Sequence, residues 1–141
     1  MGLQKTPDVL IVDDEPNNRG CLNKFLTMVG SAVRQAENGE AALRIWEEWR
    51  PALILMDVRM PVMNDLEATH RIRENPAGKQ TKIIALTASV MEVDRNNVIR
   101  SGVDDYLAKP FLEYELLRKI RTHLVSHHRP VRARARLSRS R

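Results

Sequence analysis

The sequence has almost no cysteine and no long apolar run. Cys21 is the single cysteine among 141 residues, so an internal disulfide is excluded and a reducing compartment such as the cytosol is expected. Apolar runs such as 53–56 and 83–86 fall far short of the roughly 20 residues that span a bilayer. Residues 1–8 contain no apolar signal core. We therefore expect a cytoplasmic protein without membrane contact.

Acidic residues are absent from the C-terminal segment 129–141, which is rich in arginine. The formal charge of +5 comes from this segment, and the rest of the chain is nearly neutral. We predict one domain over residues 1–126, followed by a basic, disordered tail over 127–141. A linker remnant is preferred over a nucleic-acid arm, because basic runs bind phosphate backbones without specificity. Nucleic-acid contact is expected only through this tail.

Short apolar runs alternate with stretches of helical periodicity along the whole domain. The runs end at turn residues, and the helical stretches carry apolar residues on one stripe. Strands are expected at 9–12, 31–36, 53–56, 83–86 and 103–107, and helices at 16–29, 41–49, 66–74, 90–100 and 112–125.

This alternation predicts an α/β fold. The strands are apolar enough to be covered on both faces, which is typical of a parallel sheet with helices on either side. The doubly wound order 2-1-3-4-5 of flavodoxin-like folds fits five strands at this length, and the weakly apolar second strand, 31–36, suits a sheet edge. In that order, ligands bind beyond the carboxyl ends of the first and third strands.

Polar side chains follow four of the predicted strands. Asp13 and Asp14 follow the first strand, Asp57 the third, Thr87 the fourth and Lys109 the fifth. Each has an ordinary explanation alone, as a helix cap, a turn residue or a solvated charge. Together they converge on one rim of the sheet, which favours a functional site.

The chemistry of this set indicates phosphoryl transfer. Three crowded carboxylates raise each other's pKa unless a cation lies among them, and Mg²⁺ prefers carboxylate, water and phosphate oxygens. Asp57 can act as a nucleophile toward phosphorus and form an acyl phosphate. The Lys109 ammonium and the Thr87 hydroxyl can then hold the phosphoryl oxygens.

Four segments carry a family resemblance: VLIVDDEPNNR, LILMDVRMPVMNDLEATHRIR, IIALTA and GVDDYLAKPF. Across residues 8–124 the chain resembles the receiver domains of two-component response regulators, including those fused to hybrid histidine kinases. The resemblance implies a phosphorelay domain that accepts a phosphoryl group on Asp57 from a histidine kinase or a histidine phosphotransfer domain. It implies no separate substrate, only catalysis of its own Mg²⁺-dependent phosphorylation and slow dephosphorylation.

The same resemblance assigns roles to the remaining residues. Asp13, Asp14, Asp57 and the backbone carbonyl of Arg59 would hold Mg²⁺, and Lys109 would contact the phosphoryl group before a cis bond to Pro110. Thr87 and Tyr106 would form a switch pair that reports through the face built from the predicted helix 90–100, strand 103–107 and helix 112–125. A phosphorylation-dependent homodimer is an open alternative for that face.

The chain departs from its relatives just beyond Asp57. Many relatives have Met-Asp-Gly where this chain has Met63-Asn64-Asp65. An acid in the first turn of a helix is favourable, so we expect the fold to tolerate the change. Arg59 is close enough in sequence to reach the phosphoryl group or the acidic pocket, and we predict that it modulates the dephosphorylation rate.

Three alternatives to a phosphoacceptor fit the sequence less well. A phosphatase of the haloacid dehalogenase type needs a second Asp two residues after the first, where this chain has Arg59. A phosphate- or flavin-binding module needs a loop rich in Gly, Ser or Thr after the first strand, where Asp13-Asp14-Glu15-Pro16 stands. A degenerate receiver that serves only as an interaction scaffold stays open, although the intact acids argue against it.

Overall fold

The computed structural model describes residues 7–58, 63–87 and 102–128. The chain divides into two units, Met1–Pro110 and Phe111–Arg141, and each is described by itself. The first unit contains the sheet and all the predicted site residues. No helix in the described ranges is long and apolar enough to cross a membrane.

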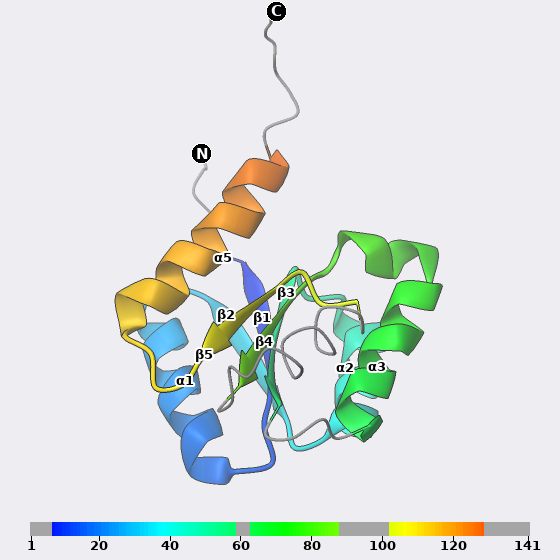
Figure 1. Cartoon of the computed structure of the whole chain (residues 1–141), viewed down its shortest axis with the longest axis horizontal. Helices are drawn as coiled ribbons and strands as arrows, with labels where there is room; N and C mark the ends of the chain where they lie inside the picture. The colour runs from blue at the N-terminus through cyan, green and yellow to red at the C-terminus, as the bar shows by residue number, and fades with distance from the viewer. Residues whose placement is uncertain (1–6, 59–62, 88–101, 129–141) are drawn as a thin grey trace, which may run out of the picture. The chain divides into compact units, whose positions relative to one another are not determined.

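The first unit is built on a five-stranded parallel sheet (Figure 1). The strand order is β2-β1-β3-β4-β5, which confirms the predicted doubly wound topology. β1 pairs with β2 on one side and with β3 on the other, so the winding reverses between β1 and β3. The strands are β1 (Asp8–Val12), β2 (Ala32–Ala36), β3 (Leu53–Val58), β4 (Lys82–Thr87) and β5 (Asp105–Ala108).

Helices cover both faces of this sheet. Figure 1 shows α1 on one side, with α2 and α3 packed together on the other. Pro16 begins the first of them after Glu15, whose side chain accepts a hydrogen bond from the Asn17 N–H at the N-cap. The helices are α1 (Pro16–Met28), α2 (Gly39–Trp49) and α3 (Met63–Glu74). The helix predicted over 90–100 lies outside the described residues.

Two details of the predicted elements need correction. The sequence predicts no helix between 74 and 83, but Pro76–Gln80 forms a short 3-10 helix, η1. The Asn75 side chain caps it by accepting a hydrogen bond from the Ala77 N–H at 2.9 Å. In the second unit, the helix predicted to end near Val125 is α5 (Glu113–His128). Its later end has a simple reason, because the first helix-breaking residue beyond it is Pro130.

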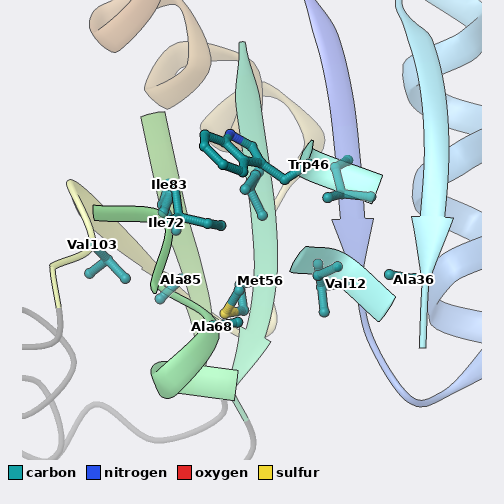
Figure 2. Close-up of a cluster of buried hydrophobic side chains, with 12 residues drawn as sticks. Val12, Ala36, Trp46, Met56, Ala68, Ile72, Ile83, Ala85 and Val103 are labelled. Atoms are coloured by element: carbon teal, nitrogen blue, oxygen red, sulfur yellow. The ribbon is translucent and has the colours of Figure 1, made fainter. Parts of the chain in front are cut away.

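Alternate residues of each central strand pack on opposite faces of the sheet. Leu10, Ile54 and Ile83 are fully buried on the face that α2 and α3 cover. Figure 2 shows this cluster, in which side chains of neighbouring strands lie beside Trp46 and Ile72 from the helices. Each such buried aliphatic side chain stabilises the fold by about 1.5–3 kcal/mol. The apolar packing therefore holds the strands in register up to the point where each one ends.

Candidate functional site

Asp13 follows β1 directly, and hydrogen bonds fix its position. Its N–H donates to the carbonyl oxygen of Ala36 at 3.0 Å, which continues the pairing of β1 with β2. Its Oδ1 accepts from the N–H of Glu15 at 2.9 Å. The Asp13 side chain is buried, whereas its neighbour Asp14 is exposed. The two adjacent acids therefore differ in exposure, and only the Asp13 side chain is enclosed by the protein.

Three carboxylates gather where β1 and β3 end. Asp13, Asp14 and Asp57 each offer one oxygen, and these oxygens lie within 4.8 Å of one another. Burial raises the pKa of Asp13, and the negative charge of Asp57 raises it further. The Glu15 N–H and the Lys109 charge offset part of this rise. The site is therefore crowded with negative charge, as the strand ends predicted.

Lys109 supplies a positive charge to the same place. Its Nζ lies 2.7 Å from Oδ1 of Asp57, whose side chain is only 2% exposed. Its backbone N–H donates to the carbonyl oxygen of Thr87 at 2.8 Å, so the end of β4 positions the lysine. The peptide bond between Lys109 and Pro110 is cis, as the resemblance implied. The structure thus brings Asp57 and Lys109 into direct contact.

Thr87 and Tyr106 lie on β4 and β5, the two strands that follow β3 in the sheet. Thr87 is the last residue of β4, is buried and pairs in register with Val58. Tyr106 lies on β5, where its half-buried side chain packs against the core cluster. The position of Thr87 agrees with the predicted rim, and the switching roles of both residues stay predictions.

The segment just beyond Asp57 is only partly described. Arg59, predicted as a carbonyl ligand and a modulator, lies outside the described residues. Asn64 and Asp65 have helical backbone, because α3 begins at Met63. The replacement of the usual glycine is therefore compatible with the first turn of a helix, as we expected.

One residue near the acids was missed in the sequence. Arg19, on the first turns of α1, donates from Nη1 to the carbonyl oxygen of Asp13 at 2.7 Å. Its only sequence signal is its spacing, because a residue six positions after Asp13 lies one to two helical turns beyond the loop. That spacing does not reveal a bond to a backbone carbonyl.

The site has the composition of a hard-cation site that can also handle phosphate. Three carboxylates within reach of one ion suit Mg²⁺, whose remaining positions are filled by water and phosphate oxygens. The raised pKa of Asp13 is what a divalent cation would relieve. The Lys109 ammonium beside the buried Asp57 can neutralise the negative charge of a phosphoryl group attached to that carboxylate.

Comparisons with known proteins point to one family. The family model described as the response regulator receiver domain matches residues 9–121. An uncharacterized 14.6 kDa protein in the sodA1 3' region of Leptolyngbya boryana is 40% identical over 119 residues, which cover 84% of this chain and 91% of that protein. The transcriptional regulatory protein SrrA of Staphylococcus aureus (strain NCTC 8325 / PS 47) is 36% identical over 83% of this chain. The chain spans about half of SrrA, 47% of its length.

Solved structures are similar in fold and sequence. One is the receiver domain of sensor histidine kinase PA1611 from Pseudomonas aeruginosa PAO1, solved with a magnesium ion coordinated in the active site cleft. It is 38% identical to this chain and superposes with a TM-score of 0.77. The match covers 84% of this chain and 98% of that one. Another is the receiver domain of the Saccharomyces cerevisiae response regulator Ssk1, solved with the histidine phosphotransfer protein Ypd1. It is 31% identical with a TM-score of 0.78, and the match covers 91% of this chain and 95% of that one.

Proposed function

The chain belongs to the response regulator receiver family, and from that premise we propose that it is a phosphoacceptor domain that is phosphorylated on Asp57. The observation that carries the proposal is the contact between Lys109 and the buried Asp57, next to two further carboxylates. A buried nucleophilic carboxylate, a charge-neutralising lysine and a candidate cation site are the parts that phosphoryl transfer to aspartate needs.

Mg²⁺ is the cofactor of this proposal. Asp13, Asp14 and Asp57 would hold it, with the backbone carbonyl of Arg59 as a further ligand. The carboxylate cluster and the magnesium-bound PA1611 receiver domain support this assignment. When bound, the cation would neutralise charge on the phosphoryl oxygens and on the carboxylates around it.

The donor is a phosphohistidine of a histidine kinase or of a histidine phosphotransfer protein. An Asp57 carboxylate oxygen forms the new P–O bond while the P–N bond to the donor imidazole breaks. The bond's electron pair stays on the imidazole nitrogen, and hydrolysis later returns inorganic phosphate and the free carboxylate. Lys109 stabilises the added negative charge through its ammonium group. The complex of Ssk1 with Ypd1 supports this choice of partner.

A switch completes the proposed function. Phosphorylation adds oxygens that the Thr87 hydroxyl can bond, and the resulting movement makes room for the Tyr106 side chain to turn inward. The switching face and its use in self-association are expectations from the family, since the helix predicted over 90–100 lies outside the described residues. Arg59 is proposed to set the lifetime of the phosphoryl group.

Intact-mass spectrometry tests the acceptor directly. The protein is incubated with a small acyl phosphate and Mg²⁺, and wild type is compared with Asp57→Asn and with the control Asp8→Asn. Asp8 is an exposed acid at the start of β1, at the opposite end of the strands. Wild type and Asp8→Asn should each gain one phosphoryl mass that a chelator prevents. A missing gain, or a gain that survives in Asp57→Asn, would favour the scaffold alternative.

A further inference from the structure

We infer that Arg19 is a positioning residue that sets the geometry of the acid pair through the Asp13–Asp14 peptide. The inference rests on the proposed function, because it concerns the same acidic site. Arg19 touches no reacting group in the proposed transfer, and its role is exerted through the backbone that carries Asp13 and Asp14. The family resemblance assigned it no role.

The Arg19 guanidinium bridges two separate elements. Nη1 donates to the carbonyl oxygen of Asp13 at 2.7 Å, and Nε donates to Oε1 of Gln35 on β2 at 3.2 Å. The Arg19 backbone N–H donates to the Glu15 carbonyl at 3.1 Å, so α1 anchors the arginine from its first turns. The side chain is half-buried. Arg19 therefore ties the acidic loop both to α1 and to the edge strand.

The bond to the Asp13 carbonyl closes a three-point restraint on this residue. The Asp13 N–H is held by Ala36 and the Oδ1 atom by the Glu15 N–H, which leaves the carbonyl as the remaining backbone group. Arg19 holds that group. All hydrogen-bonding groups of the Asp13 backbone are thus fixed before any ligand arrives.

The carbonyl that Arg19 binds belongs to the peptide unit between the two acids. A peptide unit is planar, so fixing its oxygen also fixes the direction from the Asp13 Cα to the Asp14 Cα. Asp13 is buried and Asp14 is exposed, and their carboxylates meet that of Asp57 only if this plane is correctly turned. Preorganised ligands bind a cation more tightly because the ordering is complete before binding.

Arginine suits this task better than lysine. Its planar guanidinium offers donors in a fixed fork, so one side chain can bind the Asp13 carbonyl and Gln35 at once. A lysine keeps the positive charge near the acids but lacks the fork. Comparing the two residues therefore separates an effect of charge from an effect of geometry.

The test uses Arg19→Ala, Arg19→Lys and the control Arg44→Ala. Arg44 is an exposed arginine on α2 whose guanidinium lies 4.0 Å from the exposed carboxylate of Glu40. The first measurement is amide hydrogen exchange by NMR on the metal-free protein. The Glu15 amide, which donates to Asp13, should exchange about tenfold faster in Arg19→Ala relative to the core amide of Leu10.

The second measurement is the Mg²⁺ dissociation constant by titration calorimetry. We expect Arg19→Ala to weaken Mg²⁺ binding about tenfold, since hydrogen bonds from charged donors are among the strong ones. Arg19→Lys should recover only a small part of the affinity if geometry dominates, and Arg44→Ala should match wild type. If Arg19→Lys recovered the full Mg²⁺ affinity, the effect of Arg19 would be one of charge and not of geometry, and the inference would be overturned.

The two measurements separate the inference from the function on which it rests. Unchanged Glu15 exchange and unchanged Mg²⁺ affinity in Arg19→Ala would refute the role of Arg19 and leave the acceptor proposal intact. A wild type that binds no Mg²⁺ would refute the metal site, whereas faster Glu15 exchange in Arg19→Ala would still support positioning of the acidic loop.

Discussion

The ammonium nitrogen of Lys109 lies 2.7 Å from the Oδ1 atom of Asp57. The two residues come from β3 and from the turn after β5, and β4 separates these strands in the sheet. Lys109 reaches across because its backbone is tied to the end of β4 through the Thr87 carbonyl. The sheet thus places a cation beside the one carboxylate proposed to become phosphorylated.

Replacing Lys109 with methionine should slow phosphorylation of Asp57 by a small acyl phosphate on the order of 100-fold, the size of effect seen when a preorganised charge donor is lost. Methionine keeps much of the side chain's volume but removes its charge. Intact-mass time courses at saturating Mg²⁺ measure the rate. Lys79→Met is the matched control, since Lys79 is exposed on η1, before the start of β4. Equal rates in both variants would remove Lys109 from the mechanism.

Replacing Asp13 with asparagine should stabilise the metal-free protein at neutral pH. Burial and the charge of Asp57 raise the Asp13 pKa above 3.8, so the native state holds this proton to higher pH than the unfolded chain does. The contribution of Asp13 therefore lowers the free energy of unfolding as pH rises from about 3.8 through the raised pKa. Asparagine does not ionise, so the free energy of unfolding of the variant does not fall with pH through this group.

Urea unfolding at pH 7 and near pH 3 measures this difference. Without metal, Asp13→Asn should exceed wild type in stability at pH 7, and the gap should close at the acidic pH. Added Mg²⁺ should stabilise wild type alone, because the variant lacks one ligand. The exposed acid Asp8 provides the control Asp8→Asn. A gap that is the same at both pH values would contradict the assignment to Asp13 ionisation.

Replacing Thr87 with alanine should leave the extent of phosphorylation on Asp57 largely intact but uncouple it from Tyr106. The hydroxyl is the group proposed to bond the added oxygens, while Asp57 and Lys109 are the residues proposed to carry out the transfer. Fluorotyrosine NMR, assigned with Tyr114→Phe, follows the Tyr106 environment before and after phosphorylation. Thr87→Ser keeps the hydroxyl and should retain the shift. An undiminished Tyr106 response in Thr87→Ala would refute the switch.

Replacing Arg73 with alanine should lower the free energy of unfolding by about 2–4 kcal/mol, because the change removes several hydrogen bonds and an ion pair made by one partly buried guanidinium. Arg73 donates to the carbonyls of Gly102, Gly78 and Thr81 at 2.6–2.8 Å and pairs with Asp104 at 2.6 Å. Urea unfolding gives the value.

Arg71 provides the control for Arg73 on the same helix. It forms an exposed pair with Glu67 at 3.0 Å, and its replacement with alanine should change stability by no more than about 1 kcal/mol. Comparable losses for the two arginines would contradict the importance of the carbonyl contacts of Arg73.

Replacing Gly78 with alanine should destabilise the protein, whereas Gly20→Ala should stabilise it by about 0.5–1 kcal/mol. A Cβ at Gly78 would collide with the Ile72 carbonyl oxygen, a backbone atom that cannot move aside. A Cβ at Gly20, within α1, would meet nothing within 4 Å. Thermal unfolding of the two variants should shift the midpoint in opposite directions, and a shared direction would contradict this packing.

The sequence by itself determined the sheet and the general place of the site. Five apolar runs separated by helical stripes leave few right-handed parallel topologies, and the observed order is the predicted one. Parallel strands end at one edge, so polar residues directly after them had to meet there. The sequence alone therefore groups Asp13, Asp57 and Lys109 at one site.

Only the tertiary structure decided which groups hold these residues in place. Arg19 and Arg73 bind backbone carbonyls, and every residue has such a carbonyl, so no sequence pattern marks the acceptor. Their long side chains can also reach many positions. Gly78 is required by the close approach of Ile72, which depends on how the chain turns after α3. Residue type and spacing determined what the site contains, and long-range packing determined how it is held.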